Sequence, residues 1–206
     1  MIRNNSLAEE ISGGDTDIGA IPMIRTEKRS AALAYLNQYP IVNLNITGVI
    51  ENENAAEIFV DNETEPRGVA VRTGEFIYCF TECDEVLDDI CGTLLHVPGQ
   101  YGLGGIWQPL ADKIKQRFTV RWDEPCALYY LPKPNLRTEL VRHRTESIHL
   151  EDATIVDHYY TYRDNNSLRE IAEAIKNRSS AAIYVEGKLA SWVLVHNDNS
   201  MGIMYT

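Results

Sequence analysis

The sequence predicts an α/β protein in which helices cover a mixed β-sheet, built as two successive units. Three observations support this: short apolar runs of strand length, amphipathic helical runs between them, and a polar stretch bracketed by Pro132 and Pro134. The expected segments, in chain order, are a flexible tail, a first unit, a linker and a second unit, over 1–22, 23–132, 133–140 and 141–206.

In the first unit, apolar residues at three-to-four spacing predict a helix over 26–39, which Pro40 closes. The next run, 40–52, is rich in β-branched residues and also fits a strand, but Pro40 at its start favours a helix. Apolar runs between turn residues then predict three strands, with a tight hairpin at Gly74 between the last two. These strands are expected over 55–61, 68–73 and 75–81.

A helix is predicted over 81–94, capped by Thr81 and opened by acidic residues, with Val86, Leu87 and Ile90 facing inward. The glycine-rich run 102–105 is interpreted as a turn beside a closely packed strand. A phosphate-binding loop is disfavoured because two residues separate these glycines from the next helix. That helix, and a closing strand, are expected over 108–118 and 126–131.

In the second unit, the same reasoning predicts a strand, two helices, a hairpin and a last strand. The hairpin turns at Glu186-Gly187, a pair that suits positive φ angles. The second helix is amphipathic, with Leu168, Ile171, Ala172 and Ile175 on one face. In order, the elements are expected over 141–150, 149–162, 166–178, 180–196 and 200–206.

Composition excludes several classes of function. The formal net charge of −11 and the lack of a basic run interleaved with aromatics argue against a nucleic-acid partner. No apolar run reaches the length of a membrane span, and the N-terminus lacks the pattern of a secretory signal. We therefore expect a cytoplasmic protein without a membrane partner.

The four cysteines form no CxxC pair and fit no zinc spacing, so we expect neither a metal site nor a disulfide framework. Cys79 and Cys126 are expected to be small core residues of strands. No two of the five histidines lie three or four residues apart, which excludes a helical metal pair.

Two groups remain as candidates for a substrate site. His196 follows a predicted strand and stands close to Asp198 and Ser200, which makes these three residues the weak catalytic candidates. Tyr159 and Tyr162 lie at the end of a predicted helix and are candidates, together with Trp192, for contacting a substrate.

The segment 180–206, "SAAIYVEGKLASWVLVHNDNSMGIMYT", resembles the centre of a GNAT-superfamily N-acyltransferase domain. It is most similar to the glycine N-acyltransferase-like (FR-type) branch and its bacterial relatives. The residues that support the resemblance are Ile183-Tyr184-Val185, Gly187, Ser191-Trp192, Met201-Gly202 and Tyr205-Thr206. The order of "YPIVNLNITGVIEN", "AEIFVDN" and "DEPCALYYLP" extends it to a GNAT-like half-domain in the first unit.

The resemblance implies acyl transfer from acetyl-CoA or another acyl-CoA to a small-molecule amine or amino acid. In this superfamily the thioester lies where two central strands separate, and backbone groups of the first strand pair with the pantetheine arm. The corresponding cofactor-binding residues here are Gly202, Ile203, Met204, Tyr205 and Thr206.

The sequence departs from the family pattern at two points, and both affect the expected activity. The pyrophosphate loop that follows this strand is missing after Thr206, so the chain is expected to be a truncated domain that is inactive alone. A glutamate that is a candidate base in the branch is matched by Ser200. The alternative is a non-enzymatic acyltransferase-like binding or regulatory module. An unpaired strand over 200–206 further predicts a homodimer or a strand-swapped oligomer.

Overall fold

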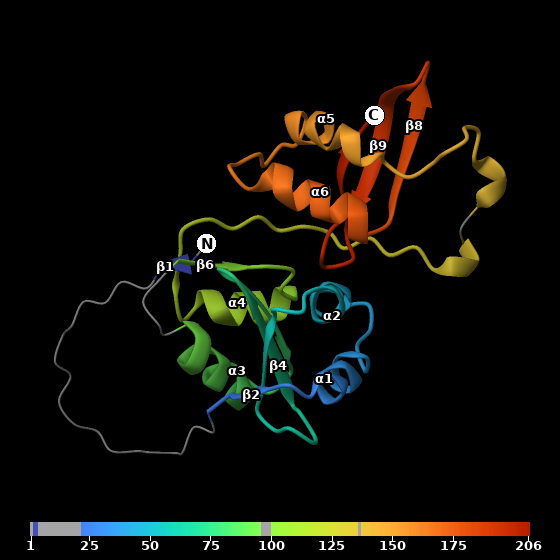
Figure 1. The fold of residues 1–206 in the computed structure, drawn as a ribbon. Coiled ribbons are helices and arrows are strands. Elements are labelled where there is room, and N and C mark those ends of the chain that lie inside the picture. The colour runs from blue at the N-terminus through green and yellow to red at the C-terminus, as the bar shows by residue number, and fades with distance from the viewer. Residues whose placement is uncertain (1, 4–21, 96–99, 136) are drawn as a thin grey trace, which may run out of the picture. The chain divides into compact units, whose positions relative to one another are not determined.

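The computed structural model describes residues 2–3, 22–95, 100–135 and 137–206, which form two compact units (Figure 1). Unit 1 is Met1–Leu128 and unit 2 is Tyr129–Thr206. The predicted tail falls almost wholly outside the described residues. The predicted linker contains two single 3₁₀ turns, Lys133–Asn135 and Thr138–Leu140.

Unit 1 is built on a seven-stranded sheet with the order β2-β3-β4-β5-β6-β1-β7. Its neighbours are antiparallel, except that β5 and β6 are parallel, which makes the sheet mixed. The predicted α/β class is thereby confirmed. The strands are β1 (Ile2–Arg3), β2 (Ile24–Thr26), β3 (Glu57–Val60), β4 (Gly68–Thr73), β5 (Phe76–Thr81), β6 (Gln100–Leu103) and β7 (Thr119–Val120).

Helices cover both faces of this sheet (Figure 1). One face packs against α1 and α2, and the other against α3, its π-helical extension and α4. The helices are α1 (Arg29–Leu36), α2 (Leu44–Asn52), α3 (Asp84–Ile90), the π-helix Cys91–Leu95, and α4 (Gln108–Lys115).

Successive side chains of a strand point to opposite faces of the sheet, so each strand contributes alternately to the two cores. On β5, Ile77 and Cys79 pack on the α3 side, whereas Tyr78 and Phe80 pack on the α1 side. On β3, Phe59 packs on the α3 side and its neighbour Val60 packs on the α1 side. Because both faces are buried, β3 to β5 read as continuous apolar runs rather than as alternating ones.

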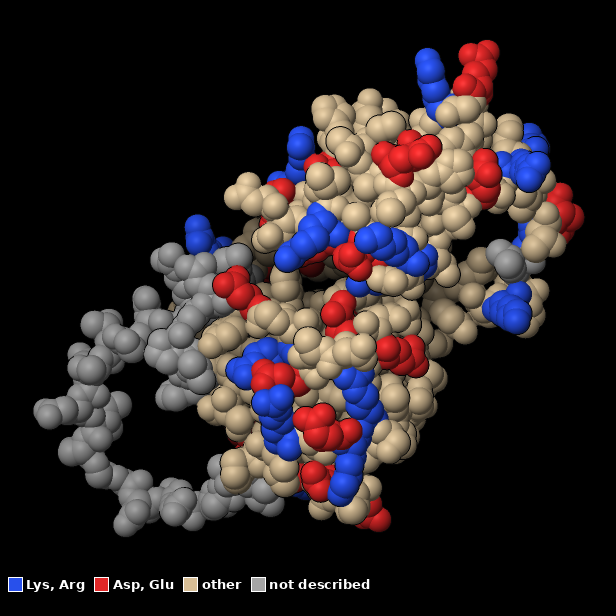
Figure 2. Space-filling model, in the orientation of Figure 1, with Lys and Arg blue, Asp and Glu red and all other residues tan. Residues whose placement is uncertain are grey.

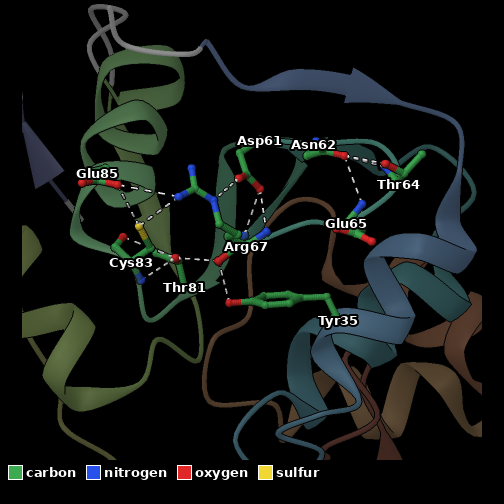
Figure 3. A network of polar contacts seen from close by, with 10 residues as sticks. Tyr35, Asp61, Asn62, Thr64, Glu65, Arg67, Thr81, Cys83 and Glu85 are labelled. Atoms are coloured by element: carbon green, nitrogen blue, oxygen red, sulfur yellow. Dashed lines mark hydrogen bonds and ion pairs between the residues drawn. The ribbon is translucent and has the colours of Figure 1, made fainter. Parts of the chain in front are cut away.

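A buried carboxylate holds the connection between β3 and β4 (Figure 3). Asp61 Oδ1 accepts the backbone N–H groups of Arg67 and Gly68 at 2.8 and 3.1 Å, and its Oδ2 lies 3.0 Å from Arg67 Nε. The carbonyl oxygen of Arg67 accepts hydroxyl bonds from Tyr35 at 2.6 Å and Thr81 at 2.8 Å. Asp61 therefore closes the loop by binding its backbone, and α1 and β5 reinforce it.

Unit 2 is a three-stranded antiparallel sheet, β10-β9-β8, with α5 and α6 packed on it (Figure 1). Its core joins Trp192 and Leu194 of β9 to Val156 of α5 and Ile171 of α6. The elements are the 3₁₀ turn Leu150–Asp152, α5 (Ala153–His158), α6 (Ser167–Asn177), β8 (Ser180–Val185), β9 (Lys188–Val195) and β10 (Met201–Tyr205). Glu186 and Gly187 have φ angles of 50° and 73°, so the predicted tight turn is confirmed.

Several predictions about single elements are wrong. Thr81 does not cap α3; it ends β5, and its hydroxyl accepts the Cys83 N–H instead. Residues 126–131 form no strand, and Cys126 is exposed while Cys79 is buried as expected. The predicted strand 141–150 is reduced to one bridge between Glu146 and Ala182.

The predicted apolar face of α6 is confirmed except at its first residue. Ile171 is buried and Ala172 and Ile175 pack against the same core, whereas Leu168 is 43% exposed. Leu168 lies in the first turn of the helix.

Candidate functional site

The candidate site lies in unit 2, around the connection between β9 and β10. Val195 pairs with Met201, so His196 to Ser200 form a five-residue loop, and Asn199 adopts a left-handed φ of 63°. The backbone N–H of His196 donates to the Ser200 carbonyl oxygen at 2.8 Å, and the Asn199 N–H donates back to His196 at 3.1 Å. These two backbone bonds close the loop into a tight turn.

Two of the three catalytic candidates bond to each other in this loop. Asp198 Oδ1 accepts the Ser200 hydroxyl at 2.6 Å and the Ser200 backbone N–H at 3.0 Å. The carboxylate positions and polarises this hydroxyl. The same two bonds, however, are those by which an Asp side chain stabilises an ordinary turn.

The third candidate, His196, lies directly on Gly202 of the next strand. A Cβ atom built on Gly202 would fall 2.1 Å from His196 Nε2 and 2.3 Å from Cδ2. A Cβ at this position would force the ring to shift, so glycine leaves room for the imidazole. The sequence analysis assigned Gly202 to backbone pairing with a cofactor, and the structure gives it this steric role as well.

The environment of His196 favours the neutral imidazole. Burial lowers its pKa from the ordinary value of 6.5; the Asp198 carboxylate opposes this shift, and the Arg178 guanidinium adds to it. At neutral pH the ring is therefore a proton acceptor.

This lowered pKa predicts a loss of stability in acid. Because the folded state binds the proton less tightly than the unfolded state, the stabilisation is complete above pH 6.5 and is lost as the pH falls through the folded pKa. NMR titration of the histidines and urea unfolding at pH 7.5 and pH 5 would measure both effects. We expect His196→Gln to reduce this part of the pH dependence, and an equal dependence in the variant would contradict the assignment.

The strand that follows carries a bulge. The pairing of β10 with β9 is regular at Gly202 and resumes at Tyr205, and Ile203 between them has a φ of 48°. A β-branched residue in this left-handed region is strained by about 1–3 kcal/mol, and such residues cluster at functional sites. The bulge alters the direction of the backbone groups of β10 within the segment predicted to bind a cofactor.

Three aromatic candidates come together beside this strand. Trp192 stacks on Tyr205 with ring centroids 4.8 Å apart and an interplanar angle of 16°. Tyr159 contacts both, at 5.9 Å from Trp192 and 4.5 Å from Tyr205. Trp192 is only 4% exposed, so Tyr159 and Tyr205 form the accessible part of the group. Tyr162 lies apart from it, against Tyr160.

The remaining residues of the cofactor segment are open to solvent. Met201 and Met204 are 73% and 65% exposed, and Tyr205 is 39% exposed. In the described part of the chain, no three His, Cys, Asp or Glu side chains gather into a group that could hold a metal ion. None of the helices among residues 22–95, 100–135 and 137–206 has the length and apolar character that crossing a membrane requires.

Sequence reasoning missed a hollow of about 640 Å³ in unit 1. It is lined by the segment before α2 and the first turn of α2, by the loop after β6, by α4 and by the extended chain after β7. These segments are distant in sequence, and no motif joins them. The nearest signal was the pair Trp107 and Trp122, which flank α4.

Comparison with known proteins supports the fold and gives no function. No protein-family model matches the chain, and no curated protein matches it in sequence. A Drosophila protein solved by a structural genomics consortium is similar in structure, with a TM-score of 0.59 and 12% sequence identity. The match covers 91% of this chain and 78% of the Drosophila chain. At this identity the likeness concerns the fold alone.

Proposed function

We propose that unit 2 binds an acyl-CoA along β10, and that the protein transfers the acyl group to a small-molecule amine or amino acid. The observation that supports this most directly is the bulged edge of β10, with Gly202 under His196 and strain at Ile203. Among the described residues, β10 pairs with β9 alone, so its other edge presents backbone groups that an extended amide ligand can bind.

The chemistry that this site would perform is an addition followed by an elimination. The neutral amine attacks the thioester carbon, the new C–N bond forms, and the C–S bond breaks to release the CoA thiol. One proton must leave the amine nitrogen, and a neutral imidazole with a lowered pKa suits that transfer at pH 7. Backbone N–H groups of a bulged strand suit the oxyanion.

The charge distribution does not favour a nucleic-acid partner. On the face shown in Figure 2, Lys and Arg side chains lie beside Asp and Glu side chains and form no continuous basic stripe. The formal net charge of −11 points the same way.

The test is an amide NMR titration of the full chain with acetyl-CoA, followed by an assay of thiol release with a panel of amino acids. We expect the largest shifts at residues 202–206. His196→Gln should lower the transfer rate by about 100-fold with little change in acetyl-CoA binding. His149→Gln is the matched control, because His149 is a half-exposed histidine of the same unit that stacks on Tyr184.

One observation favours a second candidate, a binding module without catalysis. Asp198 Oδ1 binds the hydroxyl and the backbone N–H of Ser200, which is the pattern of a turn motif and requires no catalytic role for these residues. Shifts at 202–206 without transfer to any amine would favour this module. An absence of shifts there would contradict both candidates, and light scattering would show whether a second copy occupies β10 instead.

A further inference from the structure

The hollow in unit 1 has the size and lining of a small-molecule site. Its volume of about 640 Å³ lies within the range of known ligand pockets, about 300–1,000 Å³. The apolar part of its wall includes Ile41, Leu103, Ile106 and Leu128. Such a wall suits the apolar body of a ligand.

Two indole side chains in this wall favour a cationic ligand over a neutral one. Trp107 and Trp122 both line the hollow, and they are 38% and 61% exposed. Trp107 is held by a tilted contact with Phe80, with ring centroids 5.9 Å apart. The face of an indole attracts cations, because its π-electrons are negative.

The charged side chains that line the hollow include more carboxylates than cations. The cationic Lys115 is neutralised, since its Nζ lies 2.6 Å from Asp123 Oδ2 and 3.6 Å from Asp112 Oδ1. Glu124 also lines the hollow, and among the described residues its carboxylate has no ion pair. Within the described part of the chain, Glu124 is therefore a wall carboxylate without an ion pair, and it can bind a positive charge.

We propose that this hollow binds a small organic cation, a protonated amine on an apolar or aromatic body. The amine pairs with Glu124 and the body contacts Trp107 and Trp122. This site belongs to unit 1 and does not depend on the acyl transfer proposed for unit 2.

Cys126 provides a direct readout. It lines the hollow and is exposed, whereas Cys83 is a partly exposed thiol of the same unit that does not line it. We would measure the rate at which a maleimide modifies each thiol in the full chain. The probes are phenethylamine, 2-phenylethanol and 3-phenylpropanoate, which share a phenyl body and differ in charge.

We expect phenethylamine to protect Cys126, with about fivefold tighter binding than the alcohol and weaker binding still for the carboxylate. Cys83 should react at the same rate throughout. Equal protection by all three probes, protection by the carboxylate foremost, or no protection by any would overturn the proposal.

A variant tests the charge itself. Glu124→Gln should abolish the advantage of phenethylamine over 2-phenylethanol and leave the alcohol unaffected. Glu65→Gln, in the exposed connection between β3 and β4, is the matched control and should retain the advantage. Because both residues are exposed, neither change threatens the fold, and a retained advantage in Glu124→Gln would overturn the assignment.

Discussion

Replacing Asp61 with alanine is expected to destabilise unit 1 by about 3 kcal/mol, because a buried acceptor of two backbone N–H groups is lost. The side chain of Asp61 is 3% exposed, so water does not readily replace it. The Arg67 guanidinium loses one of its two carboxylate partners as well, but this group is 53% exposed and contributes less. Urea unfolding followed by circular dichroism would measure the loss.

Two variants separate the contributions at this site. Asp61→Asn keeps one oxygen acceptor for the backbone groups and removes the charge, so we expect a smaller loss of about 1 kcal/mol. Glu85→Ala removes the other carboxylate near Arg67, which lies 3.7 Å away and is 83% exposed, and should change stability by less than about 0.5 kcal/mol. If Asp61→Ala were no worse than Glu85→Ala, the backbone bonds would not stabilise the loop.

The substitution Gly202→Ala is expected to displace the His196 ring and to destabilise unit 2 by about 1–2 kcal/mol. The added Cβ would overlap the ring at 2.1 Å, so we expect the ring to turn out of its half-buried position. Its pKa should then rise toward the ordinary value of 6.5, because the burial that lowers the pKa is removed. Histidine NMR titration and urea unfolding would measure the two effects.

A double variant distinguishes this steric contact from a backbone effect. When His196 is already alanine, the overlap no longer exists, so adding Gly202→Ala should cost little. Gly92→Ala is the control for the glycine change, because a Cβ there would meet no atom within 4 Å outside its chain neighbours and its own helix. An equal cost of Gly202→Ala with and without His196 would place the requirement in the backbone of β10.

The elements that sequence reasoning predicted well are those whose own residues determine them. The strands β3 to β5 are short apolar runs between turn residues, and both of their faces are buried. The turn at Glu186-Gly187 needs two positive φ angles, and a glycine there is a local signal. His196, Asp198 and Ser200 come together because they are neighbours in one loop.

The wrong predictions concern segments whose secondary structure depends on packing partners rather than on their own residues. The apolar run 126–131 has the composition of a strand, but its side chains are exposed and it has no partner strand among the described residues. The segment 141–150 likewise pairs at Glu146 alone. The hollow of unit 1 required the packing of four distant segments, which a single sequence does not contain.

Among residues 22–95, 100–135 and 137–206, each buried cluster draws its members from one unit. Two of these clusters lie between Met23 and Val120, and the third lies between Ile148 and Ile203. Substitutions in separate cores have nearly additive effects, whereas substitutions within one core interact. Compensating changes in the course of evolution are therefore expected to pair residues within a unit, and the two halves of the sequence can diverge at different rates.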